Sequence, residues 1–284
     1  ILMILAAYLY FNGQIVFGAV ITTIQFCSTV MNGTALLAAQ WNLIKSSKKL
    51  NEEITSLEGA SAPLQNEHQD KKVAKLQIKN LQHQFKNGEL ISYPDLTIKS
   101  GEKVLVTGDS GSGKSTLFKL ILGKLSPTSG KVIFEDKNGK EIKLNPDELG
   151  YVAQDNILFP DTIENNMTMF NSNLDKKVKR VVKQVEFEND LKKIPDGLKH
   201  EINLDEGNLS GGQKQKIVLA RAILAGSKWL FIDEGTSAID SKATKKILEN
   251  LLNQETTIVM IAHNFNNELE NLFDRKISLK NGGD

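Results

Sequence analysis

The first 44 residues of this 284-residue chain contain no Asp, Glu, Lys or Arg, although the whole chain holds 35 basic and 34 acidic residues. Helices of soluble proteins normally present a charged face to water, so this segment requires lipid or complete burial. Ile1–Phe11 would form a helix of about 16 Å, too short for a hydrocarbon core of about 30 Å. After a turn at 12–14, Ile15–Ile44 is long enough to cross the membrane. We expect a partial helix and one full span, with a buried hairpin of a soluble protein as the alternative.

The residues that flank and interrupt this segment indicate its orientation. Lys45, Lys48 and Lys49 follow it directly, and the positive-inside tendency places that end in the cytoplasm. Gln25 and Asn32 lie within the span, where they face either a polar pathway or neighbouring helices. The chain opens without an initiator Met, and we expect it to be the end of a longer protein.

Composition excludes several classes of protein. The formal net charge of +1 argues against a nucleic-acid binder that relies on bulk positive charge. The single cysteine, Cys27, excludes a disulfide framework within the chain and a cysteine-rich metal site.

The hydrophobic pattern divides the rest of the chain into a linker and an α/β domain. We expect residues 1–50 to end a membrane domain, 51–72 to form the linker, and 73–284 to form the α/β domain. Short β-rich runs separated by helical segments predict a largely parallel sheet. A mostly helical insert is expected between about Asp155 and Ser227. The expected strands include Lys103–Thr107, Lys131–Glu135, Trp229–Asp233 and Thr257–Ala262.

The segment from Gly108 to Ser115 fits the pattern G-x-x-x-x-G-K-[ST] of a phosphate-binding loop. An expected strand precedes it, and apolar residues at helical spacing follow it until Pro127. The glycines let backbone N–H groups point at phosphate oxygens, and the helix N-terminus adds positive potential. Lys114 would then neutralise the β- and γ-phosphates, while the Ser115 hydroxyl would bind Mg²⁺.

Two acids, Asp233 and Glu234, end another apolar run. Alone, such a pair is as often a solvated strand end as a site. Beside a phosphate loop, Asp233 would hold Mg²⁺ and Glu234 would polarise the attacking water. Ligands of open α/β sheets also bind at strand ends of this kind.

The pentapeptide Leu209-Ser-Gly-Gly-Gln213 resembles the signature of ABC-type ATPases, which closes over the γ-phosphate of nucleotide held by the partner subunit. From the residues alone, Ser210 and Gln213 predict a capping box at a helix start. Other family motifs then follow in order. Gln154 resembles the glutamine that senses Mg²⁺ and water, and His263 resembles the switch histidine that contacts the γ-phosphate. Phe85 stands where the family stacks an aromatic ring on adenine, with a core phenylalanine as the alternative.

The resemblance covers roughly Leu76–Asp284 and implies ATP and Mg²⁺ as cofactors. The fold implied is a P-loop NTPase domain of ABC type with a helical subdomain, preceded by the last transmembrane helices of an all-α membrane domain. The implied catalytic residues are Lys114, Gln154, Glu234 and His263, and the implied Mg²⁺ ligands are Ser115, Gln154 and Asp233. The implied nucleotide-binding residues are Phe85, Gly108, Asp109, Ser110, Gly111, Ser112, Gly113, Lys114, Ser115, Thr116, Gln154, Ser210, Gly211, Gly212, Gln213 and Asp240.

The uncharged segment and the run Leu158–Ile163 after Gln154 are similar to the exporter branch of the family. We therefore expect a multi-pass half-transporter of the plasma membrane, with its ATP-binding domain in the cytoplasm. It would pair with a second half-transporter, identical or different, and export a small molecule, lipid or peptide. Gly235 departs from the proline usual after the catalytic Glu, which would loosen that turn, and we expect the carboxyl end to be clipped.

Three other functions are less consistent with these residues. A soluble ABC ATPase acting on nucleic acid or ribosomes would carry coiled-coil arms or basic extensions instead of an uncharged segment. The ATPase subunit of an importer would lack a fused span. A non-catalytic regulator would be expected to lose Lys114, Glu234 or His263, and all three are present.

Overall fold

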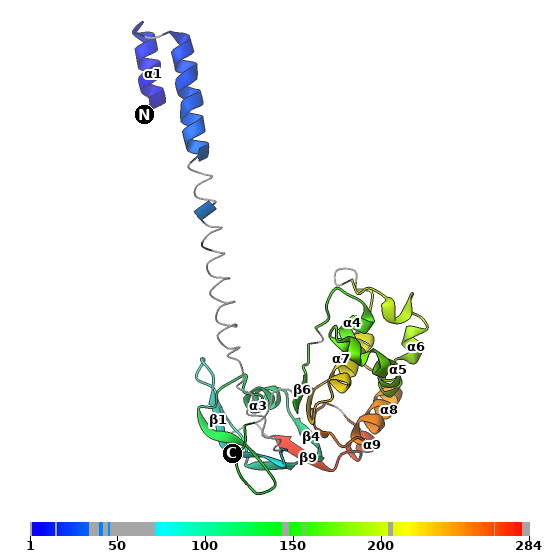
Figure 1. The fold of residues 1–284 in the computed structure, drawn as a ribbon. Coiled ribbons are helices and arrows are strands. Elements are labelled where there is room, and N and C mark those ends of the chain that lie inside the picture. Colours follow the sequence, from blue (N-terminus) through cyan, green and yellow to red (C-terminus); the bar gives the residue numbers. More distant parts are fainter. Residues whose placement is uncertain are drawn as a thin grey trace. The chain divides into compact units, whose positions relative to one another are not determined.

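The computed structural model describes residues 2–14, 16–33, 40–41, 45, 72–143, 148–155, 157–203, 207–263 and 265–279. It divides into two compact units, Ile1–Gln69 and Asp70–Asp284 (Figure 1). The expected linker lies outside the described residues except for Lys72.

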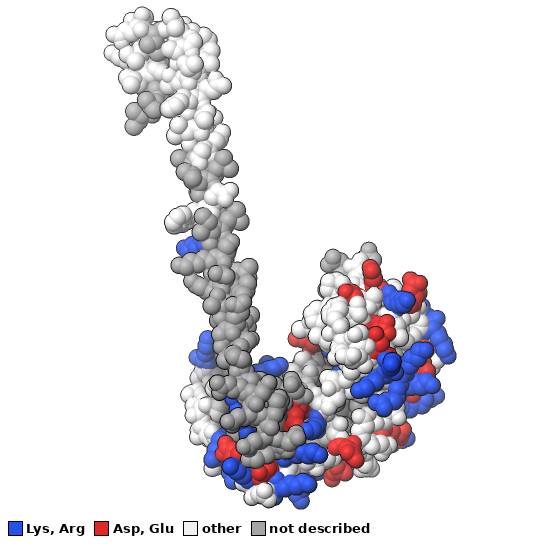
Figure 2. All heavy atoms as spheres, viewed as in Figure 1, with Lys and Arg blue, Asp and Glu red and all other residues white. Residues whose placement is uncertain are grey.

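The described residues between 2 and 33 of the first unit form two helical segments joined by a turn. Helix α1 spans Leu2–Phe11 and a second helix spans residues 17–33, with Gly13 at a φ of 69° in the predicted turn. Figure 2 shows no charged side chain on the described residues of 2–33. Within the described part of the chain, no helix combines the length and apolar character needed to cross a membrane. The expected span lies only partly within that part, since 15, 34–39 and 42–44 are outside it.

The second unit begins with an antiparallel sheet. Strand β1 (Lys75–Gln84) pairs with β2 (Leu90–Ser92) near one end and with β3 (Leu96–Lys99) near the other. It also pairs with β5 (Ser129–Glu135), again antiparallel, with Leu76 opposite Phe134. The expectation that Lys131–Glu135 joins the parallel sheet is therefore wrong. Its hydrogen bonds go to β1, and only Ile133 of this strand is fully buried, whereas strands of the parallel sheet are buried on both faces.

A five-stranded parallel sheet forms the centre of the second unit. Its strand order is β6-β7-β8-β4-β9, and every neighbouring pair is parallel. All residues of β7 (Trp229–Asp233) and β8 (Thr257–Ile261) are buried, as their continuous apolar sequences predicted. The other members are β4 (Lys103–Gly108), β6 (Leu149–Val152) and β9 (Arg275–Leu279).

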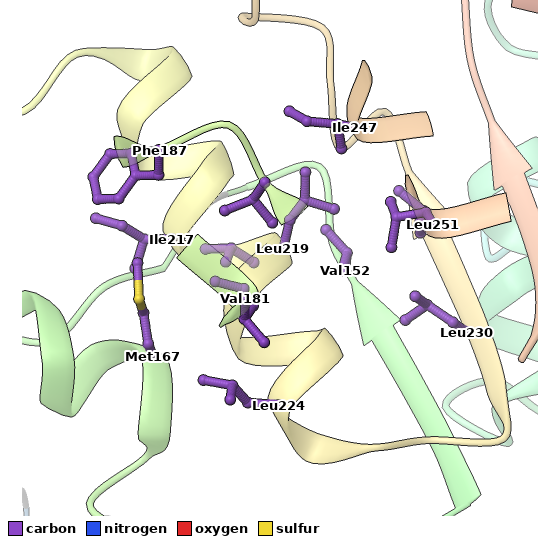
Figure 3. Packing of buried hydrophobic residues seen from close by; sticks show 14 of the residues in the cluster. Val152, Met167, Val181, Phe187, Ile217, Leu219, Leu224, Leu230, Ile247 and Leu251 are labelled. Carbon is purple, nitrogen blue, oxygen red and sulfur yellow. The ribbon is translucent and has the colours of Figure 1, made fainter. Parts of the chain in front are cut away.

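Within the described residues, the elements between β6 and β7 are all helical, which agrees with the mostly helical insert expected between about Asp155 and Ser227. Helices α4 (Ile163–Thr168), α5 (Asp175–Gln184), α6 (Glu188–Leu191) and α7 (Gly211–Ala225) lie there, with short 3₁₀ turns at Ser172–Leu174 and Gly197–Lys199. Their apolar faces form one core with the sheet, in which Met167, Phe187 and Ile217 are almost fully buried (Figure 3). Helix α3 (Lys114–Ile121) follows β4, and α8 (Ser241–Leu252) and α9 (Asn267–Glu270) flank β8.

Candidate nucleotide-binding site

Four parallel strands bring the predicted site residues to one edge of the sheet. Strand β4 ends at the glycine-rich loop, and β7 ends at Asp233, directly before Glu234. Gln154 lies two residues beyond the end of β6, and His263 lies two residues beyond the end of β8. Since these strands are parallel, their carboxyl ends share one edge, where ligands of open α/β sheets bind.

A cavity of about 360 Å³ lies at this edge of the sheet. Its volume falls within the range of small-molecule sites. Ten residues expected at a nucleotide site line it: Phe85, Ser110, Gly111, Gly113, Lys114, Ser115, Thr116, Gln154, Glu234 and His263. Two further lining residues, Glu89 and Ile91, were not expected.

The glycine-rich loop has the conformation that its sequence predicted. Gly108 and Gly113 have φ values of 148° and 82°, a region open mainly to glycine, and a Cβ at Gly108 would collide with the carbonyl oxygen of Leu279. The Lys114 ammonium curls into the loop and donates to the carbonyl oxygens of Gly108 (2.8 Å) and Asp109 (2.7 Å). Its Nζ also lies 3.4 Å from the Ser112 hydroxyl. Burial lowers the pKa of Lys114, and the charges of Glu234, Asp109 and Asp233 oppose that shift.

The Glu234 carboxylate is fixed at the cavity wall by two other site residues. Gln154 Nε2 donates to Glu234 Oε2 at 3.2 Å, and His263 Nε2 lies 3.1 Å from Glu234 Oε1. The backbone of Glu234 has a φ of 54°, unusual for a residue with a side chain, and its N–H donates to Ile261 on β8. Three residues separated by up to 109 positions thus meet at the Glu234 carboxylate, through one hydrogen bond from Gln154 and one close contact with His263.

Asp233 is a buried acid at the end of β7. Its side chain is 1% exposed, and within the described residues its Oδ1 has no hydrogen-bond partner. Burial raises the pKa of Asp233, and interaction with the Ser115 hydroxyl offsets part of that shift. Tyr151 Oη lies 3.5 Å from the other carboxylate oxygen, Oδ2, and burial together with the Asp233 charge raises the pKa of Tyr151 to about 12. A divalent cation would supply the partner that Oδ1 lacks.

The described residues contain no group of three or more His, Cys, Asp or Glu side chains that could hold a metal by themselves. A Mg²⁺ site does not require such a cluster, because Mg²⁺ is commonly bound by one or two carboxylates together with phosphate oxygens and water. Asp233, Ser115 and Gln154 fit such a site.

The signature pentapeptide lies outside the cavity. Ser210 caps helix α7, since its Oγ accepts from the Gln213 N–H at 3.3 Å and its own N–H donates to Gln213 Oε1 at 2.8 Å. This confirms the predicted capping box. Asp240 caps α8 in a similar way by accepting from the Ala243 N–H at 2.9 Å. None of Ser210, Gly211, Gly212, Gln213 and Asp240 lines the cavity as the described residues form it.

Two residues that the sequence did not single out support the site. Tyr93 is 6% exposed, and its hydroxyl donates to the Gly113 carbonyl oxygen at 2.9 Å, directly before α3. Gln215 is 3% exposed and hydrogen-bonds to the loop after Glu234. The sequence signal that could have identified Gln215 is that it is a polar residue among the apolar residues of the α7 segment. Nothing in the local sequence marked Tyr93, whose partner lies 20 residues away.

The parallel sheet, the glycine-rich loop and the acids after β7 define the class of P-loop nucleotide-binding α/β proteins. Within that class, the chain belongs to the ABC transporter family, whose profile matches residues 91–237. The resemblance based on the sequence motifs is thereby confirmed.

Relatives agree with this assignment, and a solved structure shares the fold. The lactococcin-A transport/processing ATP-binding protein LcnC of Lactococcus lactis subsp. lactis is 36% identical over 198 residues, which are 66% of this chain and 27% of that protein. The ATP-dependent permease MDL1 of Candida albicans is 36% identical over 60% of this chain and 26% of its own length. A bacterial Atm1-family ABC exporter with ATP bound shares the fold, with a TM-score of 0.67, 22% identity, and coverage of 99% of this chain and 51% of that one. The chain therefore spans about a quarter of the curated relatives' length.

Proposed function

We propose that this chain binds MgATP in the cavity beside Lys114 and hydrolyses it as the ATP-binding part of an ABC exporter. The observation that carries this proposal is the Glu234 carboxylate at the cavity wall, held by Gln154 at 3.2 Å and His263 at 3.1 Å. A carboxylate fixed in this way can orient a water molecule and accept its proton while the γ-phosphoryl group is transferred.

The phosphate loop would hold the nucleotide's phosphates. Residues of the loop and of the first turn of α3 line the cavity, and a helix N-terminus favours anions. Lys114 would exchange its bonds to the loop carbonyl oxygens for bonds to phosphate oxygens. Ser115, Gln154 and Asp233 would hold Mg²⁺, which neutralises phosphate charge when it is bound. Phe85, partly exposed at the cavity, would stack on the base.

We further propose that a second half-transporter, identical or different, completes the site. Ser210 and Asp240 match family motifs for the nucleotide interface but do not line this chain's cavity. In a symmetric dimer, the same surfaces would instead face the partner's cavity, since each subunit offers the same patch to the other. The separation of these motifs from the cavity supports that arrangement.

Export across the plasma membrane is the role that best fits the rest of the chain. The charge-free segment 1–44 would form the end of a multi-pass membrane domain, with the nucleotide-binding unit in the cytoplasm. The relatives' names describe transport proteins and a permease. The cargo would be a small molecule, lipid or peptide. If the segment spans the bilayer, alkaline carbonate should leave the chain in the membrane fraction, and its release would contradict the proposal.

Two substitutions separate the proposed roles of Glu234 and Lys114. Glu234→Gln should retain MgATP binding and lose nearly all turnover, because only activation of the water is removed. Lys114→Ala should weaken nucleotide binding itself. Glu255→Gln makes the same chemical change on an exposed side chain outside the cavity and should behave as wild type. Hydrolysis by Glu234→Gln at the wild-type rate would exclude Glu234 as the general base.

Mixing two inactive variants tests whether the site is shared. Equal amounts of Lys114→Ala and Ser210→Arg should regain about a quarter of the wild-type ATPase rate, because about half of the pairs are mixed and each has one intact site. The matched control mixes wild type with a chain that carries both changes. A shared site again gives about a quarter, from the wild-type pairs alone, whereas a site within one chain gives about half. No activity in the first mixture with half in the control would refute sharing.

A further inference from the structure

Gln215 directs its whole side-chain amide at the loop that follows Glu234. The residue lies in the second turn of α7 and is 3% exposed. Its Nε2 donates to the Glu234 carbonyl oxygen at 3.2 Å and to the Ser237 hydroxyl at 2.9 Å. Its Oε1 accepts from the Ala238 N–H at 2.8 Å. Because a backbone N–H can only donate, the bond to Ala238 fixes which end of the amide is oxygen.

The backbone that Gln215 contacts is strained. Glu234 has a φ of 54°, a backbone conformation that residues with a side chain rarely adopt and that is energetically unfavourable for them. Its N–H donates to Ile261 on β8, and its carbonyl oxygen accepts both Gln215 Nε2 and the Ser237 N–H. Gly235 follows and adds backbone freedom on that side. The peptide groups on either side of the Glu234 Cα are thus held between β8 and α7.

The same helix is capped by Ser210, so Gln215 connects two parts of the proposed site. Close packing strengthens this connection near the helix start. A Cβ at Gly212 would lie 2.8 Å from the Ala238 carbonyl oxygen, and one at Gly211 would lie 3.3 Å from the Ala238 Cβ. Helix α7 and the loop 234–238 therefore have little room to slide past each other. A displacement of α7 would be transmitted to the Glu234 backbone through the amide of Gln215.

We propose that Gln215 is a positioning residue, which holds the Glu234 carboxylate between Gln154 and His263 and couples its orientation to helix α7. This inference rests on the proposed role of Glu234 in ATP hydrolysis. Gln215 does not line the cavity, so it would act through Glu234 and not through the nucleotide. It would link helix α7, whose cap Ser210 is proposed to face the partner's nucleotide, to the base that acts on this chain's own nucleotide.

The decisive substitution is Gln215→Glu in the full chain. It keeps the side chain's length and the acceptor for the Ala238 N–H, and Ser237 can still donate its hydroxyl proton. The donor to the Glu234 carbonyl oxygen is lost, so two oxygens then face each other, and an acidic group is added at a buried position. Since small misplacements of reacting groups cost up to about 100-fold in rate, we expect kcat for ATP to fall on the order of 100-fold. The KM for ATP and the binding of MgATP should change by less than about threefold, because no contact with nucleotide is removed.

Gln254→Glu is the matched control. Gln254 is a partly buried glutamine outside the cavity, and the same change there should leave kcat at the wild-type value. Gln215→Met serves as a second variant that keeps the length and deletes all three hydrogen bonds without adding charge. It should lower kcat by roughly tenfold, again with little change in KM.

These measurements distinguish failure of the positioning role of Gln215 from failure of the proposed ATPase function. If wild type hydrolyses ATP, Glu234→Gln does not, and either folded Gln215 variant retains wild-type kcat, the positioning role is refuted. A loss of MgATP binding that accounts for the whole loss of rate would also refute it, because the role would then be structural. If wild type itself lacks ATPase activity, or Glu234→Gln retains it, the proposed function fails instead.

Discussion

The hydroxyl of Tyr93 is a small group whose removal tests the geometry of the phosphate loop. Tyr93 lies between β2 and β3 with its ring buried, and its hydroxyl donates to the Gly113 carbonyl oxygen at 2.9 Å. Gly113 is the residue before α3 and has a φ of 82°. Tyr93→Phe keeps the ring and deletes only this hydrogen bond. We expect a modest loss of stability and weaker binding of ATP.

The expected loss of stability depends on the hydrogen bonds that the Gly113 carbonyl oxygen keeps after the substitution. The Gly113 carbonyl oxygen also accepts the Leu117 N–H at 2.8 Å, so no buried acceptor is left without a partner. The cost should therefore be that of one neutral hydrogen bond, about 0.5–1.5 kcal/mol in the free energy of unfolding. For a domain of this size, 1 kcal/mol corresponds to a fall of about 2–4 °C in Tm. If half of this energy is lost from the bound loop, KM for ATP should rise roughly twofold to threefold.

Urea unfolding and steady-state ATPase assays measure the two effects. Tyr8→Phe, on a tyrosine that is 63% exposed in the first unit, is the control and should change neither the free energy of unfolding nor KM. A Tyr93→Phe protein as stable as wild type would show that the hydrogen bond contributes nothing. A loss above about 3 kcal/mol would show that the ring had also moved, since that exceeds one neutral hydrogen bond.

Three other substitutions address the cavity. Phe85→Ala should raise KM for ATP roughly tenfold or more and lower kcat less, because base stacking is worth about 1–3 kcal/mol. GTP should be accepted to some extent, since an aromatic ring face does not distinguish the edges of the bases. An unchanged ATP affinity in Phe85→Ala would favour the alternative that Phe85 is a core residue. Lys114→Ala should abolish the rise in Tm that saturating MgATP gives wild type, as nucleotide then binds too weakly to stabilise the fold. Asp233→Asn should raise Tm at pH 7 without nucleotide or Mg²⁺, because it removes a buried charge. Burial raises the pKa of Asp233, so wild type loses stability as the pH rises from the ordinary aspartate pKa through the raised one. The advantage of Asn should therefore be absent well below the ordinary pKa and complete above the raised one; an advantage at low pH alone would contradict this explanation.

Local sequence determined the parts of this protein whose partners lie within a few residues. The loop from Gly108 to Ser115 could be predicted because its glycines permit backbone angles that other residues avoid, and a strand and a helix adjoin it. The capping box was equally local, since Ser210 and Gln213 lie one helical turn apart. The absence of charge from the first 44 residues needed no structure at all.

Tertiary structure decided which of these pieces meet. Gln154, Glu234 and His263 come into contact only because β6, β7 and β8 are neighbours and run parallel, an order that no local pattern encodes. The sheet to which β5 belongs also depends on its pairing partner. An apolar run can join a parallel or an antiparallel sheet, and β5 joins the antiparallel one because its hydrogen bonds go to β1. Gln215 shows the limit most plainly. Its three hydrogen bonds reach residues 19 to 23 positions away. The role of this buried amide could therefore be inferred only from the folded structure, which shows its partners. Backbone conformation and helix capping are short-range properties, whereas a catalytic group assembled from several strand ends depends on the whole packed sheet.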